Sequence, residues 1–209
     1  MKIARLLLTL LLVASIAFIV RQRPWAAQQA QQPSTQTLSS SGQRLAASMQ
    51  AKLDHIQQNA QRSSPDQTPT VMTEEEVNDY IASGQIVLPQ GVKKLRLEGR
   101  SGVVTAFLNV DFDQIRAGQK SANPLLSVFN GQHDVRVEAD AAGSGGEGSV
   151  HVHEVSIDGF AVPRMALEYF VSKYITPKYP GIGLDSKFKL PDKIDLATVG
   201  YHKLTVTQK

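Results

Sequence analysis

The sequence has no cysteine at all, a single tryptophan and few aromatic residues for its 209 positions. The absence of cysteine excludes a disulfide framework, thiol catalysis and cysteine-based zinc sites. The fold must therefore be held together by an ordinary apolar core. The last 140 residues are enough to form one.

Most of the chain also lacks an excess of basic over acidic residues. The formal net charge is +3 and the pI is about 9.1. The first 23 residues contain four Lys and Arg and no acid, which leaves 18 Lys and Arg against 19 Asp and Glu in the rest. The rest of the chain has a net charge of −1, and it has no basic stretch interleaved with aromatics. The sequence therefore predicts that the protein has no nucleic-acid partner.

An uncharged apolar run occupies the N-terminus. It extends over 15 residues, Leu6–Val20, and follows the basic residues Lys2 and Arg5. A secretory signal has a basic start and an apolar stretch of roughly 7–15 residues, whereas a spanning helix needs about 20. Residues 1–23 are therefore predicted to be a signal peptide or a transmembrane anchor, with residues 3–20 as the membrane contact.

The residues after the run favour a retained anchor over a cleaved signal. Trp25 lies beside Arg21 and Arg23, and indole rings prefer the headgroup layer of a bilayer. We therefore expect a protein anchored in the inner membrane and facing the periplasm. If the segment is cleaved, the protein is secreted to the periplasm.

A glutamine-rich tract, residues 24–69, follows the N-terminal segment. Twelve of the 46 residues from Gln22 to Gln67 are glutamine, and a tract of such low hydrophobicity is typical of a disordered linker. Residues 42–61 are a possible amphipathic helix because four apolar residues follow helical spacing. They are Leu45, Met49, Leu53 and Ile56. A weakly helical spacer is the favoured interpretation; the alternative is a helix that lies on a membrane or pairs with a copy of itself.

Residues 70–209 have the pattern of one α+β domain. Thr73 and Glu76 form a capping box that starts a short helix. The periodicity then changes to two for four strands, returns to a helical period at 163–175, and ends with two or three further strands. Strands joined mostly by hairpins, with two helices, indicate an antiparallel sheet with helices on one face.

The sequence contains little that specifies chemistry. The glycine-rich segment 143–148 precedes a strand and is interpreted as a hairpin tip, since phosphate binding needs a helix start. His151 and His153 would face the same way on a strand, and His133, Glu147 or Glu154 would have to supply a third metal ligand. We interpret both histidines as exposed and predict no metal and no cofactor. No Gly-x-Ser-x-Gly motif occurs, and we predict that the protein is not an enzyme.

Several short motifs, taken in order, carry a family resemblance. They are Thr73–Ile81, then Leu88-Pro89, then Asp158-Gly159 with Val162-Pro163, and then Phe188–Ile194. Over about residues 70–207 the chain resembles bacterial lipid-binding envelope proteins of the tubular lipid-binding (TULIP-like) class, here of a small membrane-anchored type. The resemblance implies a curved antiparallel sheet wrapped around a long amphipathic helix, with an apolar groove for acyl chains.

Carried over by position, the groove lining comes from one strand and one helix. It comprises Val104, Ala106, Leu108, Val110, Phe112, Leu167, Phe170, Val171 and Tyr174. The expected function is an extracytoplasmic, membrane-tethered lipid-binding domain that handles envelope lipid. The alternative is a ligand-free structural or scaffolding module of a cell-envelope complex, with an envelope protein as its partner.

Overall fold

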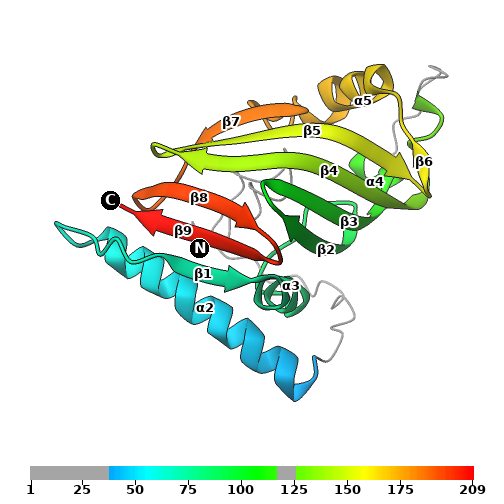
Figure 1. Cartoon of the computed structure of the whole chain (residues 1–209). Helices are drawn as coiled ribbons and strands as arrows, with labels where there is room; N and C mark the ends of the chain where they lie inside the picture. Colours follow the sequence, from blue (N-terminus) through cyan, green and yellow to red (C-terminus); the bar gives the residue numbers. More distant parts are fainter. Residues whose placement is uncertain (1–37, 117–125) are drawn as a thin grey trace, which may run out of the picture.

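A large open antiparallel sheet and a few helices make up the α+β fold (Figure 1). The computed structural model describes residues 38–116 and 126–209. Within these residues the strands are β1 (Thr70–Thr73), β2 (Val92–Arg100), β3 (Val103–Asp111), β4 (Gln132–Ser144), β5 (Glu147–Ile157), β6 (Phe160–Ala161), β7 (Asp185–Lys189), β8 (Ile194–Gly200) and β9 (Lys203–Gln208). The helices are α2 (Ser40–Ala60), α3 (Glu74–Ala82), α4 (Phe112–Ile115), α5 (Arg164–Phe170) and the π-helix η2 (Val171–Ile175).

Strand β4 is the centre of the sheet. Along one edge it pairs with β5 over almost its whole length. Along the other edge it pairs first with β3 and then, at Ala142 and Gly143, with β8. The path therefore runs β1-β9-β8-β4-β3-β2, and β5 adds β6 and β7 on the far side. The hairpins β2–β3, β4–β5 and β8–β9 all lie where the sequence predicts strands joined by turns.

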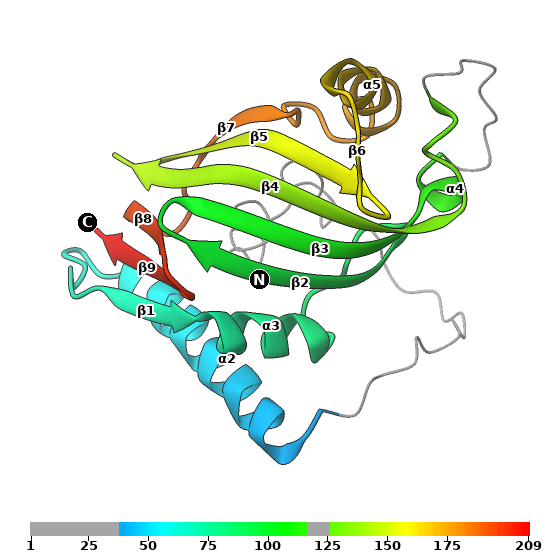
Figure 2. The same cartoon turned by 45° about the vertical axis from the view of Figure 1, so that its right-hand side comes forward.

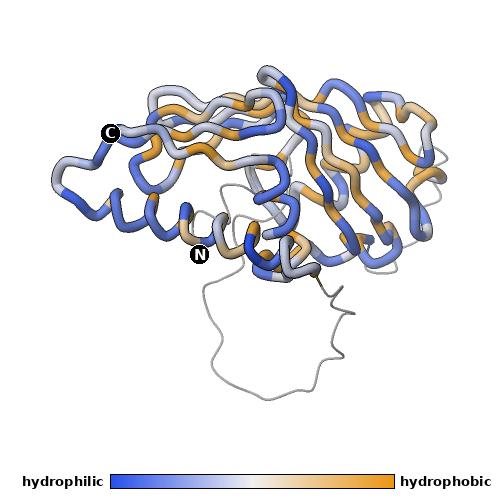
Figure 3. Tube along the Cα trace, turned by 60° about the horizontal axis from the view of Figure 1, so that its bottom comes forward, coloured by the Kyte–Doolittle hydropathy of each residue, from blue (hydrophilic) through white to orange (hydrophobic). Residues whose placement is uncertain are grey.

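A period of two in hydropathy explains the strands. On β3, Val104, Ala106, Leu108 and Val110 are buried. Figure 3 shows apolar and polar segments alternating along the strands of the sheet. We call the face that carries the buried side chains the inner face. Successive residues of a strand point to opposite sides, so this alternation puts one side of each strand into the core.

Helix α3 begins as the sequence predicts. The Thr73 side chain accepts a hydrogen bond from the Glu76 N–H, and the Glu76 carboxylate accepts one from the Thr73 N–H, which confirms the capping box. Asn78 then fastens the helix to β2. Its side chain donates to the Leu97 carbonyl and accepts from the Leu97 N–H, both at 2.9 Å.

Helix α2 differs from the favoured interpretation of residues 42–61 as a spacer. It packs against α3 and β1 (Figure 2), and Met49, Leu53 and Ile56 belong to the main core cluster. Its last turn is tied to the C-terminal strand, because Gln208 donates to the Ile56 carbonyl and accepts from the side chain of Asn59. The folded body therefore includes α2 as well as residues 70–209.

The predicted helix 163–175 consists of two parts. Residues 164–170 are α-helical, and a π-helical turn follows from Val171 to Ile175. The predicted N-terminal signal or anchor, residues 1–23, lies outside the described residues. Within residues 38–116 and 126–209 no helix is long and apolar enough to cross a membrane.

Candidate functional site: the inner face of the sheet

The predicted strand lining lies on the inner face. Val104, Ala106, Leu108 and Val110 are all buried, and their neighbours across the ladders are residues of β2 and β4. Phe112 is also buried, but it is the first residue of α4 and not the last of β3. The start of α4 turns the chain away from the sheet directly after the apolar strand.

The predicted helix lining is buried with one exception. Leu167, Phe170 and Tyr174 are buried in the core, whereas Val171 is half-buried. The change from α-helix to π-helix falls at Val171, where the hydrogen bond from Thr176 N–H to Val171 O spans five residues. A π-turn widens the helix and shifts the direction of the following side chains.

An aromatic cluster joins the two predicted linings. The Phe112 ring meets the Phe170 ring edge-on at 5.6 Å and the Phe129 ring at 5.4 Å, measured between centroids. Phe129 and Phe170 stack at 4.3 Å. The end of β3 and helix α5 are thus brought together through these rings. Phe129 is a member that the sequence interpretation did not assign to the lining; its signal was the apolar stretch around residues 124–129.

Beside this cluster lies a buried hydroxyl. The Tyr174 ring is 5.2 Å from that of Phe170, and the side chain is 4% exposed. Its hydroxyl oxygen is buried and has no hydrogen-bond partner within the part of the chain that the structure describes. An unpaired buried hydroxyl costs roughly 1–3 kcal/mol. A polar group of a ligand at this place would recover that energy.

The middle of the inner face carries small side chains. Ala106 on β3 has Leu97 and Val137 as its cross-strand neighbours. On β4, Ala139 and Ala141 are also buried. All three alanines are at most 4% exposed, so they are covered by the side chains packed on the inner face.

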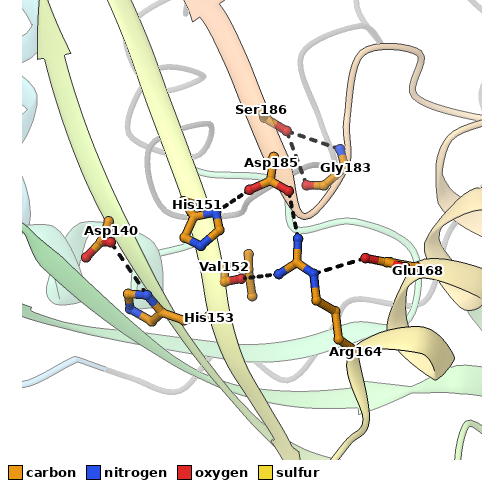
Figure 4. A network of polar contacts seen from close by, with 9 residues as sticks. All are labelled: Asp140, His151, Val152, His153, Arg164, Glu168, Gly183, Asp185 and Ser186. Atoms are coloured by element: carbon orange, nitrogen blue, oxygen red, sulfur yellow. Dashed lines mark hydrogen bonds and ion pairs between the residues drawn. The ribbon is translucent and has the colours of Figure 1, made fainter.

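On the opposite side of β5, a polar network fastens helix α5 to the sheet (Figure 4). Arg164 lies at its centre. Its guanidinium donates to Asp185 Oδ2 at 2.7 Å, to Glu168 Oε1 at 3.0 Å and to the Val152 carbonyl at 3.1 Å. Asp185 also bonds His151 Nδ1, and this hydrogen bond, together with the charges of His151 and Arg164, lowers the pKa of the Asp185 carboxyl.

Each of the two histidines of β5 lies beside an aspartate. His151 bonds Asp185, while His153 Nδ1 lies 3.5 Å from Asp140 Oδ2, and both rings face solvent (Figure 4). No group of three or more His, Asp or Glu that could hold a metal ion occurs within the described ranges. Ser186 contacts Gly183 and not a histidine. The hydrogen bonds of Arg164 to the Val152 carbonyl and to Asp185 join α5 to β5 and β7.

A second histidine–aspartate pair fixes the turn after β5. His133 Nδ1 lies 2.5 Å from Asp158 Oδ2, and the Asp134 N–H donates to the other oxygen of Asp158 at 3.0 Å. The hydrogen bond to Asp158 raises the pKa of His133, and the same bond lowers the pKa of Asp158. The turn and the start of β4 are held as one unit.

Comparison of the chain with protein-family models, with curated proteins and with solved structures finds no match. Its function is therefore inferred from the geometry of the inner face and of the surfaces around it.

Proposed function

We propose that this chain is a membrane-tethered, extracytoplasmic domain that binds lipid acyl chains against the inner face of its sheet and handles lipid in the cell envelope. In this proposal the sheet curves around the α5–η2 helix. The lining is the set predicted from the sequence, from Val104 to Phe112 on the strand side and from Leu167 to Tyr174 on the helix side.

The observation that carries the proposal is the composition of the inner face. It is apolar over β3, β4 and β5, it carries small side chains at Ala106, Ala139 and Ala141, and it ends at an aromatic cluster. Ligand sites are mostly apolar with a few placed polar groups. The Tyr174 hydroxyl, which has no hydrogen-bond partner among the described residues, is such a group. It would donate to a carboxylate or ester oxygen at the head of the acyl chain.

The test is to fill the inner face and follow binding and stability together. The full chain is purified in mild detergent, examined by native mass spectrometry for a co-purifying lipid, and titrated with a fluorescent fatty-acid analogue. The variant is Ala106→Leu. Its matched control is Thr207→Leu, which lies on another strand and is half-buried.

A groove with room for an acyl chain accepts the added leucine, so Ala106→Leu should lower probe uptake several-fold while the melting temperature changes little. A filled core behaves differently, because overpacking costs typically about 1–3 kcal/mol. A destabilised variant, together with a wild-type chain that carries no lipid and takes up no probe, would contradict the proposal.

One observation favours the second candidate, a ligand-free scaffolding module. The rings of Phe112, Phe129 and Phe170 already fill the space between the strand end and helix α5. A stable envelope protein that co-purifies with the lipid-free chain would support this function.

A further inference from the structure

Three large apolar side chains are exposed on one short segment. Phe160 on β6 is 78% exposed, and Met165 and Tyr169 on α5 are 67% and 39% exposed. Met165 and Tyr169 are four residues apart, so they lie on the same side of the helix. Phe160 precedes them by a few residues, and β6 leads directly into α5 (Figure 2). Clustered exposed apolar groups mark interaction sites.

The surroundings hold these side chains in place. The turn before Phe160 has positive φ angles at Asp158 and Gly159, of 49° and 84°, and Asp158 is bound by His133 and the Asp134 N–H. Helix α5 is fastened through Arg164 to the Val152 carbonyl and to Asp185. The exposed groups are thus preorganised, which lowers the entropy cost of binding a partner.

The charge around these groups fits an anionic lipid surface. Residues 160–181 contain Arg164, Lys173 and Lys178 against the single acid Glu168. Arg164 is paired with Glu168 and with Asp185 of β7, so Lys173 and Lys178 supply the basic charge near the exposed apolar groups. The Lys173 ammonium lies 5.7 Å from the centroid of the Tyr169 ring. Tyrosine prefers the membrane interface, and lysine is attracted to anionic headgroups. The core of a protein interface is instead depleted in lysine, so the composition favours a bilayer over a protein partner.

The β6–α5 segment that carries these side chains lies opposite the N-terminal end of α2, where the chain enters the domain. In Figures 1 and 2, which share a vertical axis, α5 lies at the top and the first turn of α2 at the bottom. Helix α2 alone is about 31 Å long, at 1.5 Å per residue. Only the 17 residues 21–37 separate the predicted membrane segment from the described part of the chain. Because the chain enters the domain at the end opposite to α5, the exposed side chains face away from the membrane that holds the predicted anchor.

We propose that Phe160, Met165, Tyr169 and Lys173 form a docking surface that inserts shallowly into a second, anionic bilayer facing the one that holds the tether. This inference rests on the membrane tether of the proposed function but not on lipid binding at the inner face.

The experiment places a fluorescent reporter on the docking surface. The full chain carries Trp25→Phe, which removes its only tryptophan, and Phe160→Trp. It is reconstituted into phosphatidylcholine host vesicles and mixed with acceptor vesicles that contain phosphatidylglycerol and a brominated phospholipid, which quenches tryptophan at the acyl chains. The matched control is Val87→Trp, since Val87 is 83% exposed and lies between α3 and β2.

Acceptor vesicles should quench the tryptophan at position 160 and leave the one at position 87 bright. Adding Lys173→Glu should weaken the quenching at position 160, because the variant loses its attraction to the anionic lipid. Equal fluorescence with and without acceptor vesicles would overturn the docking surface. The brominated lipid is also placed in the host vesicles instead of the acceptor vesicles. If the tryptophan at position 160 is quenched only in that arrangement, the assignment of the docking surface to a second membrane is overturned.

Flotation of the host vesicles distinguishes failure of the membrane tether from failure of the docking surface. A chain that does not float with the host vesicles contradicts the tether, and so contradicts that part of the proposed function. The tryptophan at position 160 of the free chain then reports directly whether the docking surface enters acceptor vesicles.

Discussion

Single polar side chains connect distant parts of this chain. Glu76 starts helix α3, yet it also accepts hydrogen bonds from the Lys52 ammonium and the Ser48 hydroxyl of α2, each at 2.6 Å. Burial would by itself raise the pKa of Glu76, but the hydrogen bonds from Lys52, Ser48 and the Thr73 N–H outweigh burial and lower it. The Glu76 carboxylate thus caps α3 and also holds α2 against it.

Removing the charge of Glu76 should therefore destabilise the fold. Glu76→Gln loses charge-assisted hydrogen bonds, each worth about 1.5–3 kcal/mol, and we expect a loss of this size in urea unfolding at pH 7. Because the folded-state pKa is lowered, this stabilisation is present above the ordinary carboxyl pKa and is lost as the pH falls through the lowered value.

The neighbouring Glu75→Gln serves as the control. Glu75 is exposed in the same helical turn, so it experiences a similar helix dipole without the contacts to α2. Equal effects of the two substitutions would contradict the role assigned to Glu76.

The pair His133–Asp158 gives a prediction with the opposite sign. The pKa of His133 is raised by Asp158, so the stabilisation is complete below the ordinary histidine pKa and is lost as the pH rises through the raised value. Asp158→Asn should shift the imidazole titration of His133, followed by NMR, to lower pH. Asp140→Asn, beside His153 on the same sheet, should leave it unchanged.

At the scale of elements, local signals predicted the fold well and long-range contacts were missed. Three features depend only on residues a few positions apart: the capping box at Thr73, the hairpins and the amphipathic residues of α5. Hydropathy periodicity and short motifs can therefore predict them. The packing of α2 depends on β1, α3 and residue Gln208, which lies 149 residues from Asn59. Composition cannot record such a contact, so a glutamine-rich tract was interpreted as a linker.

The same distinction applies to the candidate site. Alternation along β3 was sufficient to predict that Val104 to Val110 are buried on one side. It could not show that Phe129 would stack on Phe170, because that contact is made by a loop and a helix distant in sequence. The π-turn at Val171, which leaves that residue half-buried, has no hydropathy signal either.

Because α2 belongs to the folded body, its buried residues should contribute to stability. Ile56 is fully buried, and truncating a buried isoleucine to alanine costs about 2–5 kcal/mol. Ile56→Ala should lower the free energy of unfolding by this amount in a single cooperative transition seen by circular dichroism. The exposed Gln58→Ala on the same helix should have little effect; an equally small effect of Ile56→Ala would mean that α2 is not packed.

At the scale of the molecule, the sheet depends on the short contact between β4 and β8. Gly143 lies at this contact, and a Cβ atom there would come within 2.9 Å of both the Ala197 methyl and Leu190 Cδ1. The main chain reinforces the same region, because Gly102 N–H donates to the Val199 carbonyl. Two groups of strands are therefore joined where there is no room for a side chain.

Gly143→Val should separate these strands. Overpacking costs typically about 1–3 kcal/mol, and we expect a loss in that range or above, measured by thermal unfolding, with increased amide exchange in β8. Ser144→Val, at the next position and exposed, is the control. A Gly143→Val protein as stable as the control would contradict the close approach.

Strand β9 lies between β8 and β1, and its Gln208 bonds the last turn of α2. The last residues of the chain are therefore an interior part of the sheet and not an appendage. Among the described residues, β9 is the strand that pairs with β1, and Gln208 is one of the residues that hold α2. A truncation within β9 would therefore remove contacts of both β1 and α2 at once, although those elements lie more than 120 residues earlier in the chain.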